Sequence, residues 1–333
     1  MFAPHFMTLV FTLCSVNYLA QAHTLGDSLR EQNPDFEYVI GLVDKLETKE
    51  IDKSKLPDYQ LLEIDKINIS DFAGMCERYN ITELNTAVKP YYFDYFLKNR
   101  PDITNIIYFD PDIIIFDKLT HLIENLTENN IVVTPHMTTP YNDDKWQREE
   151  DIINTGIFNF GFVAIKRSTE AQKMIIWWCD KLKNECIIDL CNGLFVDQHW
   201  AEFFPVYFDK VFIDKHLGNN VAYWNLHERL CSFVNNRWVI NGNIPLHFFH
   251  YSGYLIAKPN EVSKYQNRIN FEERADIVPL FELYRNQLLA KNELYWKNFR
   301  CDYIKPKKAQ RLVRVRKYTK LPLEKLASFI EKL

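Results

Sequence analysis

At residues 105–116 the chain reads Asn-Ile-Ile-Tyr-Phe-Asp-Pro-Asp-Ile-Ile-Ile-Phe. Two runs rich in Ile, Tyr and Phe flank the acidic tripeptide, and such runs are typical of a strand that is buried on both faces. Pro111 has no N–H to donate, so the strand must end or bend there. The pattern therefore puts Asp110 and Asp112 at the end of a buried strand, where open α/β sheets bind their ligands.

Asp110 and Asp112 also predict a metal site. One rigid residue separates them, so both carboxylates can converge on a single divalent cation. Mg²⁺ and Mn²⁺ prefer oxygen ligands and often bridge protein carboxylates to phosphate. The alternative is an Asp-Pro turn with two solvated acids, but a plain surface turn needs no apolar run on either side.

Strand and helix patterns alternate through the first half of the chain. Asp71 is expected to cap its helix, and Pro90 to kink its helix or to start a new one. This alternation predicts an α/β fold whose mainly parallel sheet is flanked by helices. We expect strands at residues 7–13, 36–43, 59–64, 131–135 and 156–165, and helices at 19–32, 71–79, 83–98 and 168–186.

The remaining segments are less regular. Residues 141–151 are charged and predict a loop, residues 279–298 predict a helix, and the region after Asp197 is expected to be irregular. Eight basic residues lie within 305–320, and an amphipathic helix is predicted over 321–333. Such a tail is typical of a contact with an anionic membrane surface, with a solvated basic segment and a packing helix as the alternative.

Composition limits the class of protein. A net charge of -4 gives no global basic character, so we expect no nucleic-acid partner. The seven cysteines include no CxxC pair, which argues against a zinc site or a disulfide framework and favours a reducing compartment. Residues 1–13 lack the basic start of a signal peptide, and no apolar stretch is long enough to span a membrane. We expect a cytoplasmic protein with peripheral membrane contact through its tail.

Five short motifs together resemble those of GT-A-type nucleotide-sugar glycosyltransferases, close to the retaining group of glycogenin and the lipooligosaccharide galactosyltransferases. Their order and rough spacing carry the resemblance, which extends from the first strand to about residue 259. The motifs are Asn17-Tyr18, Asp110-Pro111-Asp112, Phe158-Asn159-Phe160-Gly161, Asp197-Gln198 and His250-Tyr251-Ser252-Gly253.

The resemblance implies a set of metal ligands. Asp110 and Asp112 match the pair that holds a divalent cation on the donor diphosphate. His250 matches the third ligand, in a motif of the type HxxGxxKP, with a core histidine among aromatic residues as the alternative. Gly253 is in register with that motif and favours the ligand. Two carboxylates with an imidazole suit Mn²⁺ somewhat better than Mg²⁺.

The resemblance also implies contacts with the nucleotide. Asn17 and Tyr18 match the place where the family holds the base and the ribose, with the tyrosine ring on uracil. Lys258, followed by Pro259, is a candidate for the charge on the diphosphate, although it lies two residues later than the lysine of the family motif. Lys89 is the second candidate, with a solvated helix lysine as its alternative.

Four further residues match the part of the family's site that holds the sugar. Asn159 and Gly161 match the strand that passes the sugar, where a glycine admits close backbone approach and an amide reaches a hydroxyl. Asp197 and Gln198 match the pair that grips sugar hydroxyls beside the anomeric carbon, and the resemblance gives them the catalytic role.

The function that the resemblance implies is transfer of a hexose from a UDP-sugar to a glycan acceptor, with a metal ion and with retention at the anomeric carbon. It implies a catalytic domain over residues 1–260, with a nucleotide-sugar half (1–117) and an acceptor half (118–260), then a helical segment (261–304) and the tail (305–333). A nucleotidyltransferase is one alternative, but it would need a Gly-rich phosphate loop, and the nine glycines are not clustered. A non-catalytic nucleotide-sugar-binding protein and a plain interaction protein are the others, and the intact acidic residues argue against both.

Overall fold

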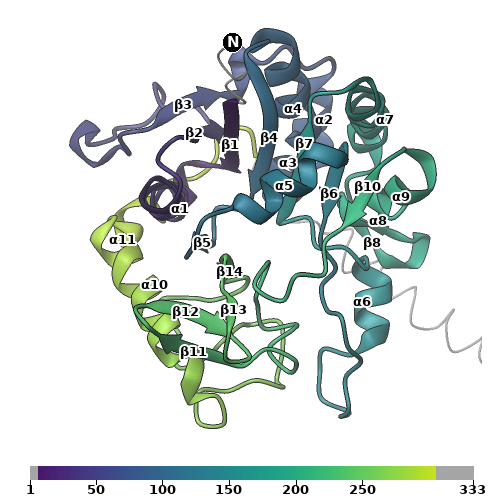
Figure 1. The fold of residues 1–333 in the computed structure, drawn as a ribbon. Helices are drawn as coiled ribbons and strands as arrows, with labels where there is room; N and C mark the ends of the chain where they lie inside the picture. Colours follow the sequence, from purple (N-terminus) through teal and green to yellow (C-terminus); the bar gives the residue numbers. More distant parts are fainter. Residues whose placement is uncertain (1–6, 305–333) are drawn as a thin grey trace, which may run out of the picture.

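A seven-stranded sheet forms the centre of the computed structural model, which describes residues 7–304 (Figure 1). β7 runs antiparallel to its neighbours β4 and β6, and every other pair of strands is parallel, so the predicted mixed, mainly parallel sheet is confirmed. In spatial order the strands are β10 Val211–Ile213, β6 Ile131–Val133, β7 Phe162–Lys166, β4 Ile103–Phe109, β1 Met7–Cys14, β2 Glu37–Leu42 and β3 Gln60–Glu63.

Helices bury both faces of this sheet. Successive residues of a strand point to opposite faces, so Val10 packs in one cluster while Leu9 and Phe11 pack in the other. The first cluster includes α1 Leu19–Gln32, α5 Thr120–Glu128 and α10 Val278–Ala290. The second includes α2 Phe72–Arg78, α3 Ile81–Ala87, α4 Lys89–Asn99 and α7 Thr169–Glu185.

The chain turns sharply where β1 leaves the sheet. β1 is buried along nearly its whole length, and the short 3-10 helix η1 Val16–Tyr18 follows at its carboxyl end, directly before α1. Both the first strand and the first helix lie where the sequence predicts them. Asn17 and Tyr18 therefore stand at the carboxyl edge of the parallel strands, where such sheets bind ligands.

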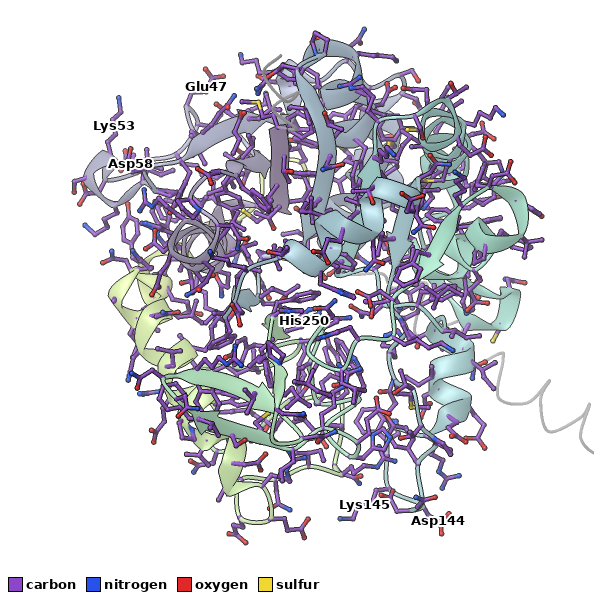
Figure 2. The ribbon with its side chains drawn as sticks, in the orientation of Figure 1. Glu47, Lys53, Asp58, Asp144, Lys145 and His250 are labelled. Atoms are coloured by element: carbon purple, nitrogen blue, oxygen red, sulfur yellow. The ribbon has the colours of Figure 1, made fainter. Side chains whose placement is uncertain are left out.

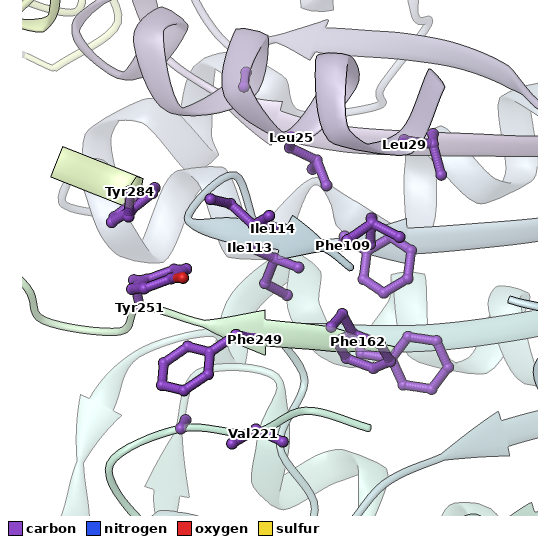
Figure 3. Packing of buried hydrophobic residues seen from close by; sticks show 14 of the residues in the cluster. Leu25, Leu29, Phe109, Ile113, Ile114, Phe162, Val221, Phe249, Tyr251 and Tyr284 are labelled. Carbon is purple, nitrogen blue, oxygen red and sulfur yellow. The ribbon is translucent and has the colours of Figure 1, made fainter. Parts of the chain in front are cut away.

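The run at residues 105–116 divides into two strands at Pro111. β4 ends at Phe109, and β5 Ile113–Ile115 leaves the large sheet to pair antiparallel with β14 Phe248–His250. In this register His250 lies opposite Ile113, next to Asp112. Figure 3 shows Ile113 and Ile114 packed below Leu25 of α1. The predicted break at Pro111 therefore carries the chain from one sheet to another.

Three predicted elements need correction. The strand expected over 156–165 begins only at Phe162, because Gly156 ends α6 Glu149–Thr155 with φ +110° and the chain must first bend back. That helix also takes up the end of the loop expected at 141–151. The helix expected over 279–298 divides at Asn292, whose φ of +61° stops α10 and starts α11 Glu293–Trp296.

The structure also shows how two helices begin, at Asp71 and at Pro90. Asp71 stands at the N-cap position of α2, but its left-handed backbone leaves its side chain without a capping hydrogen bond. Pro90 starts a new helix, since α3 ends at Ala87 and α4 begins at Lys89 with the proline in its first turn.

The part after Asp197 includes several short elements, as expected for an irregular region. They are α8 Gln198–Ala201, α9 Phe204–Tyr207, β11 Cys231–Val234, β12 Arg237–Ile240 and β13 Ile244–Pro245, and the two-residue strands β8 Ile188–Asp189 and β9 Leu194–Phe195 come just before it. Residues beyond 260, among them Ile277, Phe281 and Trp296, pack in the same cluster as α1. The division of the chain at residue 260 stays a prediction.

The tail expected to contact membrane, residues 305–333, lies outside the described residues. Within 7–304 no helix is both long and apolar enough to cross a membrane. The seven cysteines are all free, and none of them forms a disulfide.

Candidate active site

Asp110, Asp112 and His250 converge between the large sheet and the C-terminal strands. His250 Nε2 lies 3.1 Å from Asp112 Oδ1 and 3.8 Å from Asp110 Oδ2. One ligand atom from each residue lies within 4.8 Å of the other two, so a single cation can reach all three. Figure 2 shows His250 near the middle of the molecule. The three predicted ligands thus form a candidate metal site.

The local sequence fixes this geometry. The Asp110 N–H donates to Gly161 O (2.7 Å), and the Tyr251 N–H donates to Asp112 O (2.8 Å), so both acidic residues are held by their backbones. A Cβ added to Gly161 would lie 2.4 Å from His250 Cε1. Any side chain at position 161 would therefore collide with the imidazole ring of His250. From the resemblance, the close approach at Gly161 was expected to be to the sugar.

Buried polar groups orient the ligands. His250 Nδ1 lies 3.3 Å from the Asn220 side-chain oxygen, which leaves Nε2 to face the carboxylates. Tyr108 donates its hydroxyl to Asp110 Oδ1 at 2.6 Å. Burial lowers the pKa of His250, but the charge and hydrogen bond of Asp112 outweigh it, so the pKa lies above its usual value.

A cavity of about 330 Å³ opens beside the two carboxylates. Tyr18 is 40% exposed and lines this cavity together with Asn17. Partial desolvation raises the pKa of Tyr18 to about 12, and the carboxylate of Asp112 adds to the effect. Residues of α3 and of the C-terminal helices α10 and α11 also line the cavity.

The structure separates Gly253 from Lys258. Gly253 lines the cavity with φ +75°, but Lys258 does not line it and instead pairs with Glu261 at 2.9 Å on the surface. The chain then folds back, so that the Lys264 N–H donates to Gly253 O and Lys264 lines the cavity. Lys264, not Lys258, therefore lies at this cavity, and the sequence reading missed it because the fold-back has no motif of its own.

Lys89 is neither a cavity residue nor a solvated lysine. Its side chain is 3% exposed, and Nζ donates to Asp197 Oδ2 at 2.6 Å and to Phe160 O at 2.7 Å. The ammonium also lies 4.3 Å from the centre of the Tyr108 ring. Lys89 therefore does not face the cavity, where contact with a diphosphate was expected. Because α4 begins inside the core, Lys89 instead forms an ion pair with Asp197.

Asp197 and Gln198 are also satisfied within the protein. Burial raises the pKa of Asp197, although the charge of Lys89 acts against it. Gln198 Oε1 accepts from the Phe160 N–H (3.1 Å) and lies 3.3 Å from Asn159 Nδ2, and its Nε2 donates to Thr155 O.

Asn220 joins this group to the metal ligands. Its Nδ2 donates to Asn159 Oδ1 at 3.0 Å, while its own oxygen faces His250. The predicted sugar residues therefore form one connected network with the metal ligands. Asn220 was missed, because no sequence pattern shows that the turn at Asn219-Asn220 meets both groups.

Comparison with known proteins gives the family. Residues 9–188 match the model of glycosyl transferase family 8, more than half of the chain. The uncharacterised protein YfnF of Bacillus subtilis strain 168 is 24% identical over 277 residues, which cover 83% of this chain and 90% of that protein.

Two solved structures are among those similar to the chain. The bifunctional glycosyltransferase WbbM has a TM-score of 0.50 at 14% identity, with 88% of this chain and 52% of that chain covered. The galactosyltransferase LgtC, solved with donor and acceptor sugar analogues, has a TM-score of 0.48 at 14% identity, with 85% and 96% covered. The likeness to WbbM supports the fold alone. From its family match, the chain belongs to glycosyl transferase family 8 and is a glycosyltransferase.

Proposed function

We propose that this glycosyltransferase moves a hexose from a UDP-sugar to a glycan acceptor, with a divalent cation and with retention at the anomeric carbon. The observation that carries the proposal is the convergence of Asp110, Asp112 and His250 beside a cavity of about 330 Å³. That volume lies within the range of ordinary ligand pockets.

The donor set fits Mn²⁺ or Mg²⁺. Two carboxylate oxygens are hard ligands, and an imidazole beside them favours Mn²⁺ somewhat. His250 also has the second contact typical of a metal ligand, because its other ring nitrogen faces the Asn220 amide oxygen. When bound, the cation would neutralise charge on the diphosphate and so make it a better leaving group.

The cavity supplies the contacts for the nucleotide. Tyr18 offers a ring face to the base, and Asn17 lies next to it. Lys264 is exposed at the cavity, and within residues 7–304 it forms no ion pair with a carboxylate. We therefore assign the diphosphate contact to Lys264 in place of Lys258.

The sugar lies, in this proposal, against the network of Asp197, Gln198 and Asn159. Gln198 would sit by the anomeric carbon, where its carbonyl oxygen can stabilise developing positive charge. An inverting enzyme needs a carboxylate base on the face opposite the leaving group. The Asp197 carboxylate is buried and already accepts a hydrogen bond from the Lys89 ammonium, so it is not free to take a proton from an acceptor, which supports retention. The departing phosphate oxygen would then take the acceptor proton.

The test is a panel of UDP-sugars with Mn²⁺, scored for slow hydrolysis of the donor without acceptor. We expect one UDP-sugar to be hydrolysed, with the activity lost on chelation of the metal and in Asp112→Ala. Proton NMR of the transfer product formed from an α-linked donor should show an α linkage. A β product would overturn retention, and turnover only of other nucleotide sugars would overturn the choice of UDP.

A further inference from the structure

A second cavity lies at the surface, beside the loop that joins β6 to α6. Its volume is about 570 Å³, which is within the range of ordinary ligand pockets. Figure 2 shows Asp144 and Lys145 of this loop at the edge of the molecule, whereas His250 lies near the middle. None of its lining residues lines the first cavity, and they are Asp144, Trp146, Arg148, Glu150, Asp151 and Asn267.

Trp146 is the large apolar residue of this second cavity. It is 46% exposed, although tryptophan is highly buried on average. Tryptophan is enriched where proteins meet partners, because its ring offers a broad apolar face and its N–H a polar edge. An exposed ring that lines a cavity is therefore a candidate contact for a ligand.

The backbone of the loop is held firmly under this ring. The Trp146 N–H donates to Asn267 Oδ1, and the Asn267 N–H donates to Trp146 O, both at 2.8 Å. Arg268, which is itself buried, donates to both carboxylate oxygens of Asp143 (3.1 and 3.0 Å) and to Lys145 O (2.8 Å). The loop thus presents Trp146 in a fixed position, so that a ligand would lose little affinity to ordering of the loop.

Polar groups of both kinds surround the ring. Asp144, Arg148 and Glu150 are exposed, and within residues 7–304 none of them forms an ion pair. The side-chain oxygen of Asn267 accepts from the Trp146 N–H, which leaves its side-chain nitrogen to donate. Carboxylates accept hydrogen bonds, whereas a guanidinium and an amide nitrogen donate them. A sugar has the matching chemistry, since it has an apolar C–H face and hydroxyls that both donate and accept.

The two cavities adjoin along one segment of the chain. Lys264 and Tyr265 line the first cavity, and Asn267, two residues beyond Tyr265, lines the second. Tyr223 lies between them, with its ring centre 6.5 Å from that of Tyr265. Burial raises the pKa of Tyr223, and Tyr265 and Asp151 are among the groups that add to the effect. Residues from both cavities therefore surround the same ring.

We propose that the second cavity binds the glycan acceptor, at sugars distant from the hydroxyl that reacts. The inference rests on the proposed function, which requires such an acceptor. Trp146 would pack against the face of one sugar, while the polar groups around it hold the hydroxyls. Three carboxylates and one guanidinium line the cavity, and this excess of negative charge repels an anionic ligand. The acceptor is therefore a neutral or amino-sugar glycan of several sugars.

Binding to the full chain tests this proposal without turnover. The protein is applied, without nucleotide or metal, to an array of neutral, amino-sugar and acidic oligosaccharides of one to six sugars. We expect the wild type to bind neutral or amino-sugar oligosaccharides of three sugars or more. Single sugars and acidic oligosaccharides should bind about tenfold more weakly or worse.

An NMR titration with the oligosaccharide that binds best then compares variants. Trp146→Ala should bind it about tenfold more weakly than the wild type, whereas Trp146→Phe keeps a ring and should retain most of the affinity. Phe233→Ala removes a 58% exposed ring on β11, outside both cavities, and should leave the affinity unchanged. All variants should unfold at the same urea concentration as the wild type.

Four results would overturn the proposal. They are equal affinity of the wild type and Trp146→Ala, a preference for acidic oligosaccharides, no oligosaccharide bound by the wild type, and a loss of binding in Trp146→Ala that is explained by unfolding.

Failure of this inference is distinguishable from failure of the proposed function. If no UDP-sugar is hydrolysed but oligosaccharides bind through Trp146, the choice of donor fails and the glycan site stands. If a UDP-sugar is hydrolysed and Trp146→Ala binds oligosaccharides as the wild type does, the proposed function stands and the acceptor lies elsewhere.

Discussion

The two halves of the candidate site differ in how their polar groups are satisfied. In the metal half, the carboxylates of Asp110 and Asp112 are 33% and 22% exposed and face a histidine and a tyrosine hydroxyl. In the sugar half, Asp197 and Gln198 are buried and already hold protein partners. The metal half is thus completed by what binds to it, whereas the sugar half is also part of the core. Substitutions should separate activity from stability accordingly.

The largest effect is expected in the metal half. Asp110→Ala and Asp112→Ala should each lower turnover of the UDP-sugar about a thousandfold or more, roughly 4 kcal/mol of transition-state stabilisation. The diphosphate would lose its cation, while the fold loses little because both side chains are partly exposed. Steady-state kinetics with excess Mn²⁺ and a parallel urea titration check this. Near-normal, metal-dependent turnover in either variant would refute the site.

In the sugar half, Lys89→Met should act first on stability. It leaves the carboxylate of Asp197 buried without a charge partner, which typically costs about 3–5 kcal/mol. Urea unfolding followed by tryptophan fluorescence measures the loss. Lys98→Met, on the exposed side of the same helix, should change the free energy of unfolding by less than about 1 kcal/mol and serves as the control. Equal stability of the two variants would show that the ion pair does not matter to the core.

Gln198→Ala should affect both properties moderately. We expect kcat to fall about ten- to a hundredfold, about 1.4–2.8 kcal/mol, with little change in the KM of the donor. The Phe160 N–H would also lose its acceptor, so the variant should unfold at lower urea concentration. The kcat and the KM of the donor, measured by steady-state kinetics and corrected for the fraction of folded protein, check this prediction. A KM that rises with kcat unchanged would mean that Gln198 only binds the sugar.

The smallest effect distinguishes two lysines. Lys264→Met should raise the KM of the UDP-sugar about tenfold, about 1.4 kcal/mol, because the cavity loses its unpaired ammonium. Lys258→Met removes an exposed lysine paired with Glu261 and should leave the kinetics unchanged. The reverse pattern would mean that the loop after Gly253 rearranges when the donor binds.

The sequence was a good guide to the elements that follow a local rule. A buried apolar run predicted β1, and the helical spacing of apolar residues predicted α1. Pro111 predicted the break between Asp110 and Asp112. His250 could be found because its motif retains Gly253, and the pairing of β14 with β5 then brings it to Asp112.

Residues whose role depends on a distant partner were predicted less well. Lys89 was expected to contact the diphosphate, with a solvated lysine as the alternative, because nothing near it in the sequence shows that Asp197, more than a hundred residues away, lies opposite. Lys258 was named and Lys264 was missed because the family motif is matched by spacing along the chain, whereas the chain folds back on Gly253.

Binding of Mn²⁺ by the wild type and by His250→Ala, in the presence of UDP, tests the central claim most directly. Electron paramagnetic resonance of free Mn²⁺ measures the affinity. The account predicts tight binding by the wild type that depends on UDP, and binding at least about tenfold weaker in His250→Ala, because the cation loses one of three protein ligands. Equal Mn²⁺ affinity in the two proteins would contradict a metal site formed by Asp110, Asp112 and His250.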